Sequence, residues 1–367
     1  MLDRLITAFV ALKLIVFALF GVSLALATSA EAQVSFGGGA QPKEDAPDPT
    51  ICRGANLVLS IGREHPDAMA RIDAKADATP YGYGRFWRLE KPGITSSWLY
   101  GTMHVADERA TDLSEEVRAR IAAARIVALE IKEIADPVAM QTKMGALVGK
   151  SFYLDGTTLA ARLKPRAEEA VRAALAKRGP MPWRTAQRMK PWLLMSAMLV
   201  PACETARKAE GRPIVDRLIA DLAAKAERPL VGLETVESQV ETLAGIPEPI
   251  MLAALVNVAR LGSRIDDVFE TSVALYESGE TAKLWALMQD PVFDGGLSDQ
   301  SETEREAGYA AFQTRIIDER NATMVEALVP LLEKGNAFAA VGALHLPGEQ
   351  GMLRMLERRG WLIVAME

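Results

Sequence analysis

The sequence lacks an excess of positive charge. Its 367 residues carry a formal net charge of −6 at pH 7, with a pI near 5.4. A surface that binds nucleic acid needs many Lys and Arg side chains to neutralise phosphates, so we expect no nucleic-acid partner. Hydrophobic residues make up 49% of the chain and charged residues 25%. This composition is typical of a globular protein with ample material for a core, in one large domain or two.

Long hydrophobic runs are also lacking, except for residues 14–27 near the N-terminus. A membrane-spanning helix needs about 20 apolar residues, and this run is shorter. It follows Arg4 and Lys13 and precedes an Ala-Glu-Ala sequence, an order that is typical of a secretory signal peptide. We therefore expect a signal peptide that is cleaved after Ala32, and a periplasmic or secreted protein with no stable membrane span after cleavage. The alternative is a retained membrane anchor.

Cysteine is scarce, with only Cys52 and Cys203 in the whole chain. In an exported protein an even number of cysteines favours a disulfide between them; two buried thiols are the alternative. Residues 33–49 are rich in Gly, Pro and charged residues and have no apolar period, which predicts a disordered linker. We expect the folded domain to span residues 50–367.

Histidine is scarce as well, with three residues. Two of them, His104 and His345, lie three residues after a Gly that ends an apolar run. Because Gly makes up about 7% of residues in proteins, a chosen pair would share this feature by chance about once in two hundred cases. The third, His65, has no such context, and we expect it at the surface or at a helix cap.

The sequence around the two Gly-x-x-His motifs repeats too. After His104 come a polar loop, a helical pattern with Asp112 as its expected N-cap, and a second apolar run at residues 125–131. After His345 come Leu-Pro-Gly, a helical pattern at residues 350–359 and another apolar run. The chain therefore predicts an α/β (mixed α+β) fold, in which two related strand-Gly-x-x-His-loop-helix-strand halves surround a mixed sheet.

Helical patterns fill most of the chain between the two halves. Residues 137–227 predict a large helical insertion, whose Met and Trp residues form either a packed core or a groove for an apolar or peptide-like substrate. A β-hairpin is expected where residues 85–90 and 97–100 flank a Lys-Pro-Gly turn. Residues 290–306 form a polar loop, which is either a lid or simply solvated.

Four short apolar runs end in a polar side chain: His104, Glu130, Glu234 and His345. Ligands of open α/β sheets bind outside the carboxyl ends of the strands, so we expect these four groups to converge. Two imidazoles and a carboxylate suit a borderline divalent ion such as Mn²⁺, Co²⁺ or Zn²⁺. We predict His104, Glu130 and His345 as its ligands, with Glu234 as a further ligand or the general base. The alternative is that each is an ordinary structural residue at a strand end.

Several motifs together resemble the TraB/GumN family, which belongs with the Tiki-type metalloproteases, the erythromycin esterases and the ChaN-like proteins. The similarity covers roughly residues 50–367 and rests on Gly101-Thr-Met-His104, Val127-Ala-Leu-Glu130, Gly232-Leu-Glu234 with Gln239, Arg320-Asn321 and Gly342-Ala-Leu-His345-Leu-Pro-Gly348. The resemblance implies a mixed α/β fold with the two histidines and Glu130 near a metal or catalytic centre. By analogy, Arg320 would bind a substrate carboxylate or a developing oxyanion; a surface salt bridge is the alternative.

From these patterns and this resemblance we predict an exported, metal-dependent hydrolase that acts on a peptide bond. One alternative is an esterase-type hydrolase in which a His acts as base without metal. Another is a protein that binds or sequesters a peptide without cleaving it. The expected partner is a peptide or a small-molecule substrate, and the oligomeric state is left open.

Overall fold

The computed structural model describes residues 48–366 apart from residues 178–180, 295–309 and 311–312. The predicted signal peptide, nearly all of the predicted linker and most of the predicted polar loop at residues 290–306 lie outside the described residues. Within the described residues, no single helix is long and apolar enough to cross a membrane. The helices Val236–Ala244 and Glu248–Leu261 would together be long and apolar enough, but they meet at an angle of 88°.

The described part of the chain contains one six-stranded sheet, in the order β4-β3-β5-β2-β1-β6. Strand β1 is antiparallel to both of its neighbours, and the pairs β2–β5, β5–β3 and β3–β4 are parallel. All strands except β1 therefore run in one direction, and their carboxyl ends lie at one edge. The strands are β1 (Phe86–Lys91), β2 (Ile94–Thr102), β3 (Ile126–Leu129), β4 (Leu230–Gly232), β5 (Ala337–Gly342) and β6 (Leu362–Ala365).

The predicted hairpin is present as β1 and β2. Phe86 pairs with Tyr100 and Trp87 with Leu99 across its two strands. Its turn contains Gly93 at φ +78°, a left-handed conformation that glycine adopts without steric cost. The hairpin delivers the end of β2, and with it the first Gly-x-x-His motif, to the common edge of the sheet.

The two predicted halves are both present as β-helix-β units. One half runs from β2 through α4 (Glu108–Thr111) and α5 (Glu115–Ala123) to β3, and the other runs from β5 through α20 (Met352–Glu357) to β6. The two units start on adjacent strands and cross the sheet in opposite directions. Connections of this kind are almost always right-handed, so two that lead in opposite directions along the sheet cover opposite faces of it. The predicted fold class is therefore confirmed, and β2 and β5 form the topological switch point of the sheet.

One detail of the first half was predicted wrongly. Asp112 is not the N-cap of the helix that follows the loop, because it ends α4 instead. The N-cap of α5 is Ser114, whose hydroxyl accepts a hydrogen bond from the backbone N–H of Val117. Either residue can cap a helix, and the short helix α4 decides between them.

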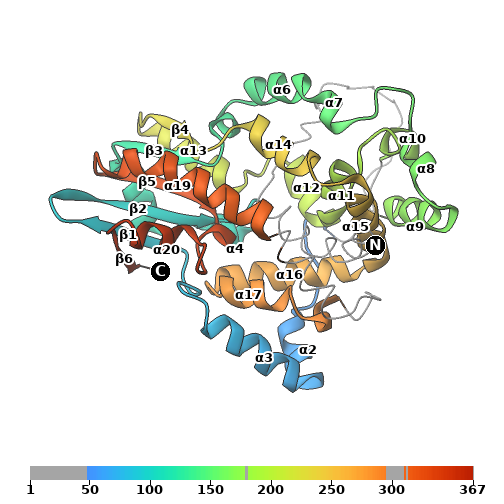
Figure 1. The fold of residues 1–367 in the computed structure, drawn as a ribbon, viewed down its shortest axis with the longest axis horizontal. Helices are drawn as coiled ribbons and strands as arrows, with labels where there is room; N and C mark the ends of the chain where they lie inside the picture. The colour runs from blue at the N-terminus through green and yellow to red at the C-terminus, as the bar shows by residue number, and fades with distance from the viewer. Residues whose placement is uncertain (1–47, 178–180, 295–309, 311–312, 367) are drawn as a thin grey trace.

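Each face of the sheet is covered by helices (Figure 1). Alternate residues of a strand point to opposite faces: Phe338 and Ala340 pack with α5 and α13 (Val215–Lys225), whereas Ala339 and Val341 pack with α19 (Glu319–Leu332) and α20. All six residues of β5 are buried. The central strand is thus apolar along its whole length, as expected for a strand buried on both faces.

Most of the described residues in the region 137–227, where a helical insertion is predicted, lie in helices. This region connects β3 to β4, and a second helical stretch follows β4. The insertion and its leading 3-10 turn comprise η2 (Lys132–Ala135), α6 (Pro137–Ala146), α7 (Val148–Ser151), α8 (Leu159–Arg162), α9 (Pro165–Ala176), α10 (Trp183–Ala186), α11 (Pro191–Leu199), α12 (Ala202–Ala209) and α13. The second stretch comprises α14 (Val236–Ala244), α15 (Glu248–Leu261), α16 (Arg264–Glu277), α17 (Thr281–Leu287), the 3-10 turn η3 (Pro291–Asp294) and the π-helix η4 (Thr314–Asp318), which leads into α19.

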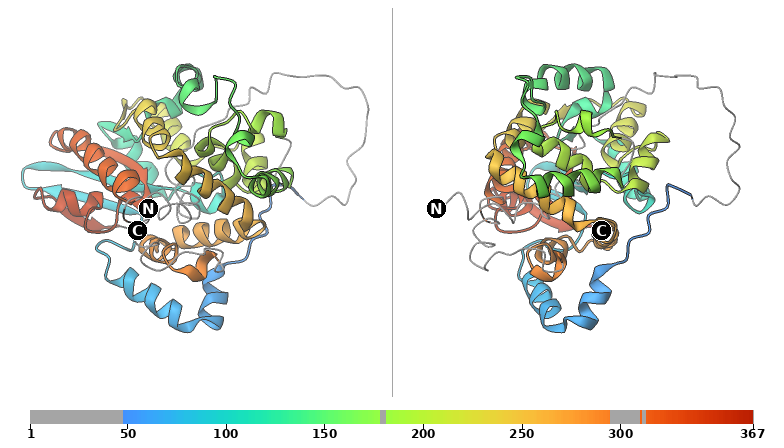
Figure 2. Two further views of the ribbon diagram at one scale, coloured as in Figure 1. Left: turned by 45° about the vertical axis from the view of Figure 1, so that its right-hand side comes forward. Right: turned by 90° about the vertical axis from the view of Figure 1, so that its right-hand side faces the viewer.

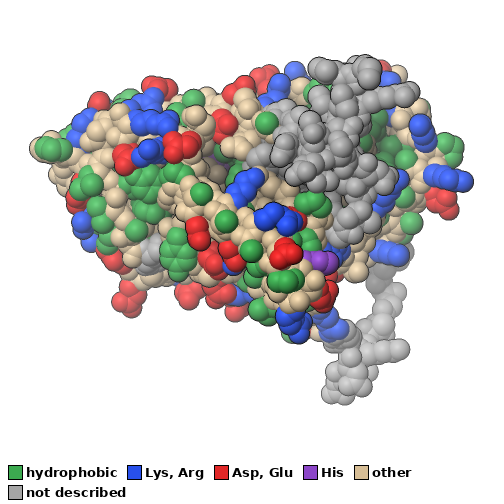
Figure 3. Space-filling model, turned by 60° about the horizontal axis from the view of Figure 1, so that its bottom comes forward, with side chains coloured by type: hydrophobic (Ala, Val, Ile, Leu, Met, Phe, Trp, Pro, Cys, Tyr) green, Lys and Arg blue, Asp and Glu red, His purple; other side chains and the backbone are tan. Residues whose placement is uncertain are grey.

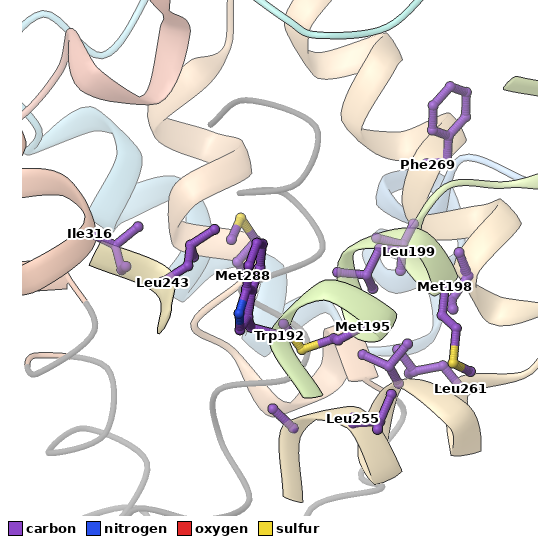
Figure 4. Close-up of a cluster of buried hydrophobic side chains, with 14 of the residues drawn as sticks. Trp192, Met195, Met198, Leu199, Leu243, Leu255, Leu261, Phe269, Met288 and Ile316 are labelled. Carbon is purple, nitrogen blue, oxygen red and sulfur yellow. The ribbon is translucent and has the colours of Figure 1, made fainter. Parts of the chain in front are cut away.

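The Met and Trp residues of the insertion form a core. Trp192, Met195 and Met198 on α11 are buried against Leu255 and Leu261 of α15 (Figure 4). The same cluster includes buried residues of α9 and α14–α17, and Figure 2 shows helices of this group beside the sheet. Methionine suits such irregular packing because its side chain is unbranched and flexible. Core packing is therefore the correct alternative for this cluster.

The N-terminal part of the described chain is tied to the helical layer. Helices α2 (Leu57–Glu64) and α3 (Pro66–Asp77) pack beside α16 and α17 (Figures 1 and 2). His65 separates them and is exposed, as predicted. The disulfide predicted between Cys52 and Cys203 is present and joins the segment before α2 to α12. On the face shown in Figure 3, acidic and basic side chains are interspersed.

Candidate functional site

The four predicted site residues come together at the carboxyl edge of the parallel strands. His104 follows β2, Glu130 follows β3, Glu234 follows β4 and His345 follows β5. The side chains of all four are buried, with exposed fractions between 1% and 8%. The convergence that the sequence predicts is therefore observed, and it lies at the switch point between β2 and β5, where open α/β sheets bind ligands.

The two Gly-x-x-His turns pack directly on each other. A Cβ atom at Gly101 would lie 3.0 Å from the Cα atom of Ala343 and 2.9 Å from the side chain of Leu346. The backbone N–H of Gly342 donates a hydrogen bond of 2.7 Å to Glu130 Oε1. The first glycine is needed for close approach of the two turns, and the second joins its turn to the end of β3.

His104 is held by Asp216 of α13. Its Nδ1 atom lies 2.6 Å from Asp216 Oδ2, and the hydroxyl of Thr102 donates a bond of 3.0 Å to Oδ1 of the same carboxylate. Burial lowers the pKa of His104, but the charge and hydrogen bond of Asp216, helped by Glu130, outweigh burial and raise it above its ordinary value. Because the carboxylate of Asp216 accepts a hydrogen bond from the N–H group at Nδ1, the lone pair of the neutral ring lies on Nε2.

His345 has different partners. Its Nδ1 atom donates to the side-chain oxygen of Asn321 over 2.6 Å, and the Asn321 amide donates to the backbone oxygen of Gln350. Its Nε2 atom lies 3.3 Å from Nη1 of Arg320, which acts as the donor. Burial, with Arg320 beside the ring, lowers the pKa of His345 well below its ordinary value. This ring is therefore neutral at physiological pH.

Arg320 is the centre of the buried polar network and not a surface residue, since its side chain is only 4% exposed. Its Nη2 atom lies 2.7 Å from Glu130 and 2.5 Å from Glu234. The amide of Gln239 donates to the same two carboxylates over 3.0 and 3.2 Å. Both Glu234 oxygens accept hydrogen bonds from Arg320, so this carboxylate is already bound to a cation.

The buried charges do not balance within this network. Glu130, Glu234 and Asp216 carry three negative charges when ionised, and Arg320 supplies one positive charge, which leaves two negative charges if both imidazoles are neutral. A proton on His104 would reduce this excess to one. Buried charges are generally paired or bound to a metal ion, so the cluster is a favourable place for additional positive charge.

The donor atoms suit a divalent ion, although they do not surround one point as they stand. Among the described residues, no three His, Cys, Asp or Glu side chains form a ready metal-binding group. Arg320 is bound to two of the predicted ligands, Glu130 and His345. Both imidazoles are nevertheless oriented by oxygen atoms at Nδ1, as metal-binding histidines usually are. A metal ion and Arg320 would therefore compete for the Nε2 atom of His345.

A small pocket lies beside His104. The residues that line it are His104, Glu130, Asp216 and Gln239, together with Leu129, Ile131 and Ile134. All four polar residues take part in the network described above. The pocket has room for about one water molecule beside the buried network.

Two further residues hold the turn after β2. The hydroxyl of Tyr276, on α16, donates a bond of 2.8 Å to the backbone oxygen of Gly101. Glu204, on α12, accepts a bond of 2.6 Å from the backbone N–H of Ala106. Neither contact was predicted from the sequence, because both residues come from helices of the insertions. They fix the backbone on both sides of His104.

Comparison with protein families gives a match over most of the chain. The model of the TraB/PrgY/gumN family matches residues 85–365, from just before β1 to the end of β6 and more than half of the chain. The matched region contains every residue of the network described above. No curated protein and no solved structure matches the chain.

Proposed function

Since this chain belongs to the TraB/PrgY/gumN family, we propose that it is a hydrolase, that it acts on peptide bonds and that it requires a divalent metal ion. The observation that supports the proposal is the convergence of two oriented imidazoles and Glu130 at the switch point of the sheet. Hydrolysis needs an activated water molecule and a group that stabilises the developing oxyanion, and this site contains candidates for both.

In this proposal His104, Glu130 and His345 hold the metal ion, which when bound would lower the pKa of a water molecule and polarise the carbonyl of the substrate. Asp216 and Asn321 keep the two rings in the orientation and tautomer that place the lone pair on Nε2.

Glu234 takes a different role from the two that its sequence context suggests. Both of its oxygens accept hydrogen bonds from Arg320, so we assign it to holding Arg320 and not to proton transfer. Arg320 Nη1, beside His345 Nε2, is the donor nearest to that ring. We assign this N–H group to the oxyanion or carboxylate of the substrate.

A second candidate is a hydrolase without a metal ion, and a specific observation favours it. Arg320 already supplies a cation to His345, Glu130 and Glu234. His104, backed by Asp216, would then take the proton of the attacking water. The opposite pKa shifts of His104 and His345 fit a pair in which one ring binds a proton more readily than the other.

The deciding experiment measures metal content and peptide cleavage in the same samples. Wild type, His345→Ala and His65→Ala would be stripped with chelator and reloaded with Mn²⁺, Co²⁺ or Zn²⁺. His65 is exposed and remote from the network, so its variant is the matched control. We expect about one metal ion per chain and metal-dependent cleavage in wild type and the control, and loss of both in His345→Ala.

The other outcomes separate the alternatives. Full cleavage by the chelated wild type, together with equal and substoichiometric metal in all three proteins, would support the metal-independent candidate. Tight peptide binding without any product would instead indicate a binding or sequestering protein.

Export is part of the same proposal. We propose that the mature protein begins at Gln33 after removal of the predicted signal peptide. N-terminal sequencing of protein recovered from the periplasm or the medium would test this. Recovery only with detergent and with Met1 still present would show a membrane anchor instead.

A further inference from the structure

Helix α12 contacts the turn that carries His104 at two points. The carboxylate of Glu204 accepts a hydrogen bond of 2.6 Å from the backbone N–H of Ala106, two residues after His104. One turn further along the helix, Arg207 lies 2.7 Å from the carboxylate of Asp107. The side chains of Glu204 and Asp107 are only 0% and 4% exposed. The backbone directly after His104 is therefore positioned by α12.

Little apolar packing holds α12 itself. Its sequence, Ala-Cys-Glu-Thr-Ala-Arg-Lys-Ala, contains no large apolar side chain. Of its eight residues, all of them described, only Cys203 and Glu204 are buried. Since most helices in proteins are held by an apolar face that packs on the core, this helix depends on other anchors. Cys203 provides one through its disulfide with Cys52, and it directly precedes the glutamate that binds the His104 turn.

The other end of the disulfide is fixed to α16. At the end of the segment that follows Cys52, the backbone N–H of Leu57 donates a hydrogen bond of 2.9 Å to the hydroxyl of Thr271. Further along α16, the hydroxyl of Tyr276 donates to the backbone oxygen of Gly101. The disulfide therefore connects the two helices that hold this turn, one before its imidazole and one after it.

We propose that Glu204 is a positioning residue for His104 and that the Cys52–Cys203 disulfide keeps it in place. Opening the disulfide then displaces the imidazole while the fold persists. This inference deepens the proposed function: its consequence for catalysis rests on that function, whereas the displacement of the ring does not. A displacement of about 1 Å in a catalytic group can lower a rate by about 100-fold.

The NMR signals of the imidazole rings test the displacement without any substrate. The chain has only three histidines, so tag-free, metal-stripped protein with isotope-labelled histidine gives three sets of ring signals, which single His→Gln variants assign. We expect the His104 signals to move by more than their linewidth when Cys52 and Cys203 are both replaced by Ser. The signals of His65, which is exposed and remote, should stay in place.

Reduction of the wild-type protein should have the same effect. A dithiol gives two electrons and two protons to the disulfide, so that two protein thiols form while the reductant closes to a cyclic disulfide. Titration of the free thiols shows when the bond is open. We expect the His104 signals to move as the thiols appear and to return on reoxidation.

Two substitutions of Glu204 separate position from charge. Both Glu204→Ala and Glu204→Gln remove the charge, but the glutamine keeps an oxygen that accepts the hydrogen bond from Ala106. We therefore expect Glu204→Ala to move the His104 signals and Glu204→Gln to leave them near their wild-type positions.

The control for a loss of stability alone is Leu332→Ala. Leu332 is fully buried at the end of α19, in an apolar cluster that contains no residue of α12, and truncation of a core leucine destabilises a protein. This variant should leave the His104 signals in place. If the wild type cleaves peptides, kcat should fall by about 10- to 100-fold in Glu204→Ala and in the protein without the disulfide, with a smaller change in KM, and Glu204→Gln should retain most of the activity.

Each outcome has a distinct meaning. His104 signals that stay in place once the disulfide is open, or that move as far in Leu332→Ala, would overturn the inference. Equal movement in Glu204→Ala and Glu204→Gln would overturn it as well, because charge and not position would then be the cause. Absence of peptide cleavage by wild type would overturn the proposed function alone, since the ring signals need no substrate and still decide this inference.

Discussion

Replacement of Arg320 by Met should destabilise the protein strongly and in a pH-dependent way. Arg320 is 4% exposed and lies 2.7 and 2.5 Å from two carboxylates that are each 3% exposed. Removal of one partner from a buried ion pair typically costs about 3–5 kcal/mol. Because Arg320→Met leaves both Glu130 and Glu234 without this partner, we expect a loss near the upper end, about 5 kcal/mol, at pH 8.

The pH dependence follows from the carboxyl groups. Burial raises the pKa of Glu130, and Arg320 opposes this rise, so the pKa of Glu130 should be higher still without the guanidinium. A carboxyl group whose pKa is raised in the folded state costs stability above that pKa. The cost disappears as the pH falls through the folded-state pKa toward the unfolded value. The loss caused by Arg320→Met should therefore be smaller at pH 5 than at pH 8.

Urea unfolding of wild type and variants at pH 5, 6.5 and 8 measures this loss. Arg172→Met is the control, because Arg172 is 56% exposed and its pair with Glu168 lies on the surface, where ion pairs contribute about 0–1 kcal/mol. Adding Glu130→Gln and Glu234→Gln to Arg320→Met should restore much of the stability at pH 8. A loss no larger than that of the control, or a loss that does not change with pH, would refute the reasoning.

Three other predictions follow from the same contacts. Asp216→Asn should shift the acidic limb of the kcat/KM profile to lower pH, because the charge that raises the pKa of His104 is removed; an unmoved limb would contradict this. Replacing both cysteines by Ser should cost about 2–5 kcal/mol in urea unfolding, and thiol titration of the unreduced, denatured wild type should find no free thiol. Gly101→Ala should lower the free energy of unfolding by about 1–3 kcal/mol. Gly62→Ala is the control, because a Cβ atom there meets no atom within 4 Å, and it should not destabilise the protein. Equal Tm values for these two variants would argue against the close approach of the two turns.

The convergence of the strand-end residues could be predicted because it depends on local features. An apolar run that stops at a Gly or at a charged residue marks the end of a buried strand, and the carboxyl ends of parallel strands share one edge. His104 and His345 each follow an apolar run that stops at a Gly, and each lies at the carboxyl end of a parallel strand. The repeat of the whole strand-loop-helix-strand context also predicted the two related halves.

The partners of these residues could not be predicted in the same way. Asp216 lies in the first turn of α13, where an acidic residue is common because it favours the positive end of the helix dipole. Its contact with His104 spans 112 residues and depends on how α13 docks on the sheet. The resemblance to the family suggested Arg320 as a site residue, but only the packing of α19 shows that Arg320 binds Glu130, Glu234 and His345 together.

The two histidines lie in similar backbone turns, yet their imidazole rings have different hydrogen-bond partners and opposite pKa shifts. Their Gly-x-x-His turns follow adjacent parallel strands, yet one ring is held by a carboxylate and the other by an amide beside a guanidinium. These partners come from the first turns of α13 and α19, which cover opposite faces of the sheet. The sheet therefore places the rings together, and the two helices set their pKa values apart. A metal-dependent site would depend on the orientation that Asp216 and Asn321 give to the rings, whereas a metal-independent site would depend on the difference between the two pKa values. Asp216→Asn should therefore weaken metal binding in the first case. In the second case it should change only the pH profile of cleavage.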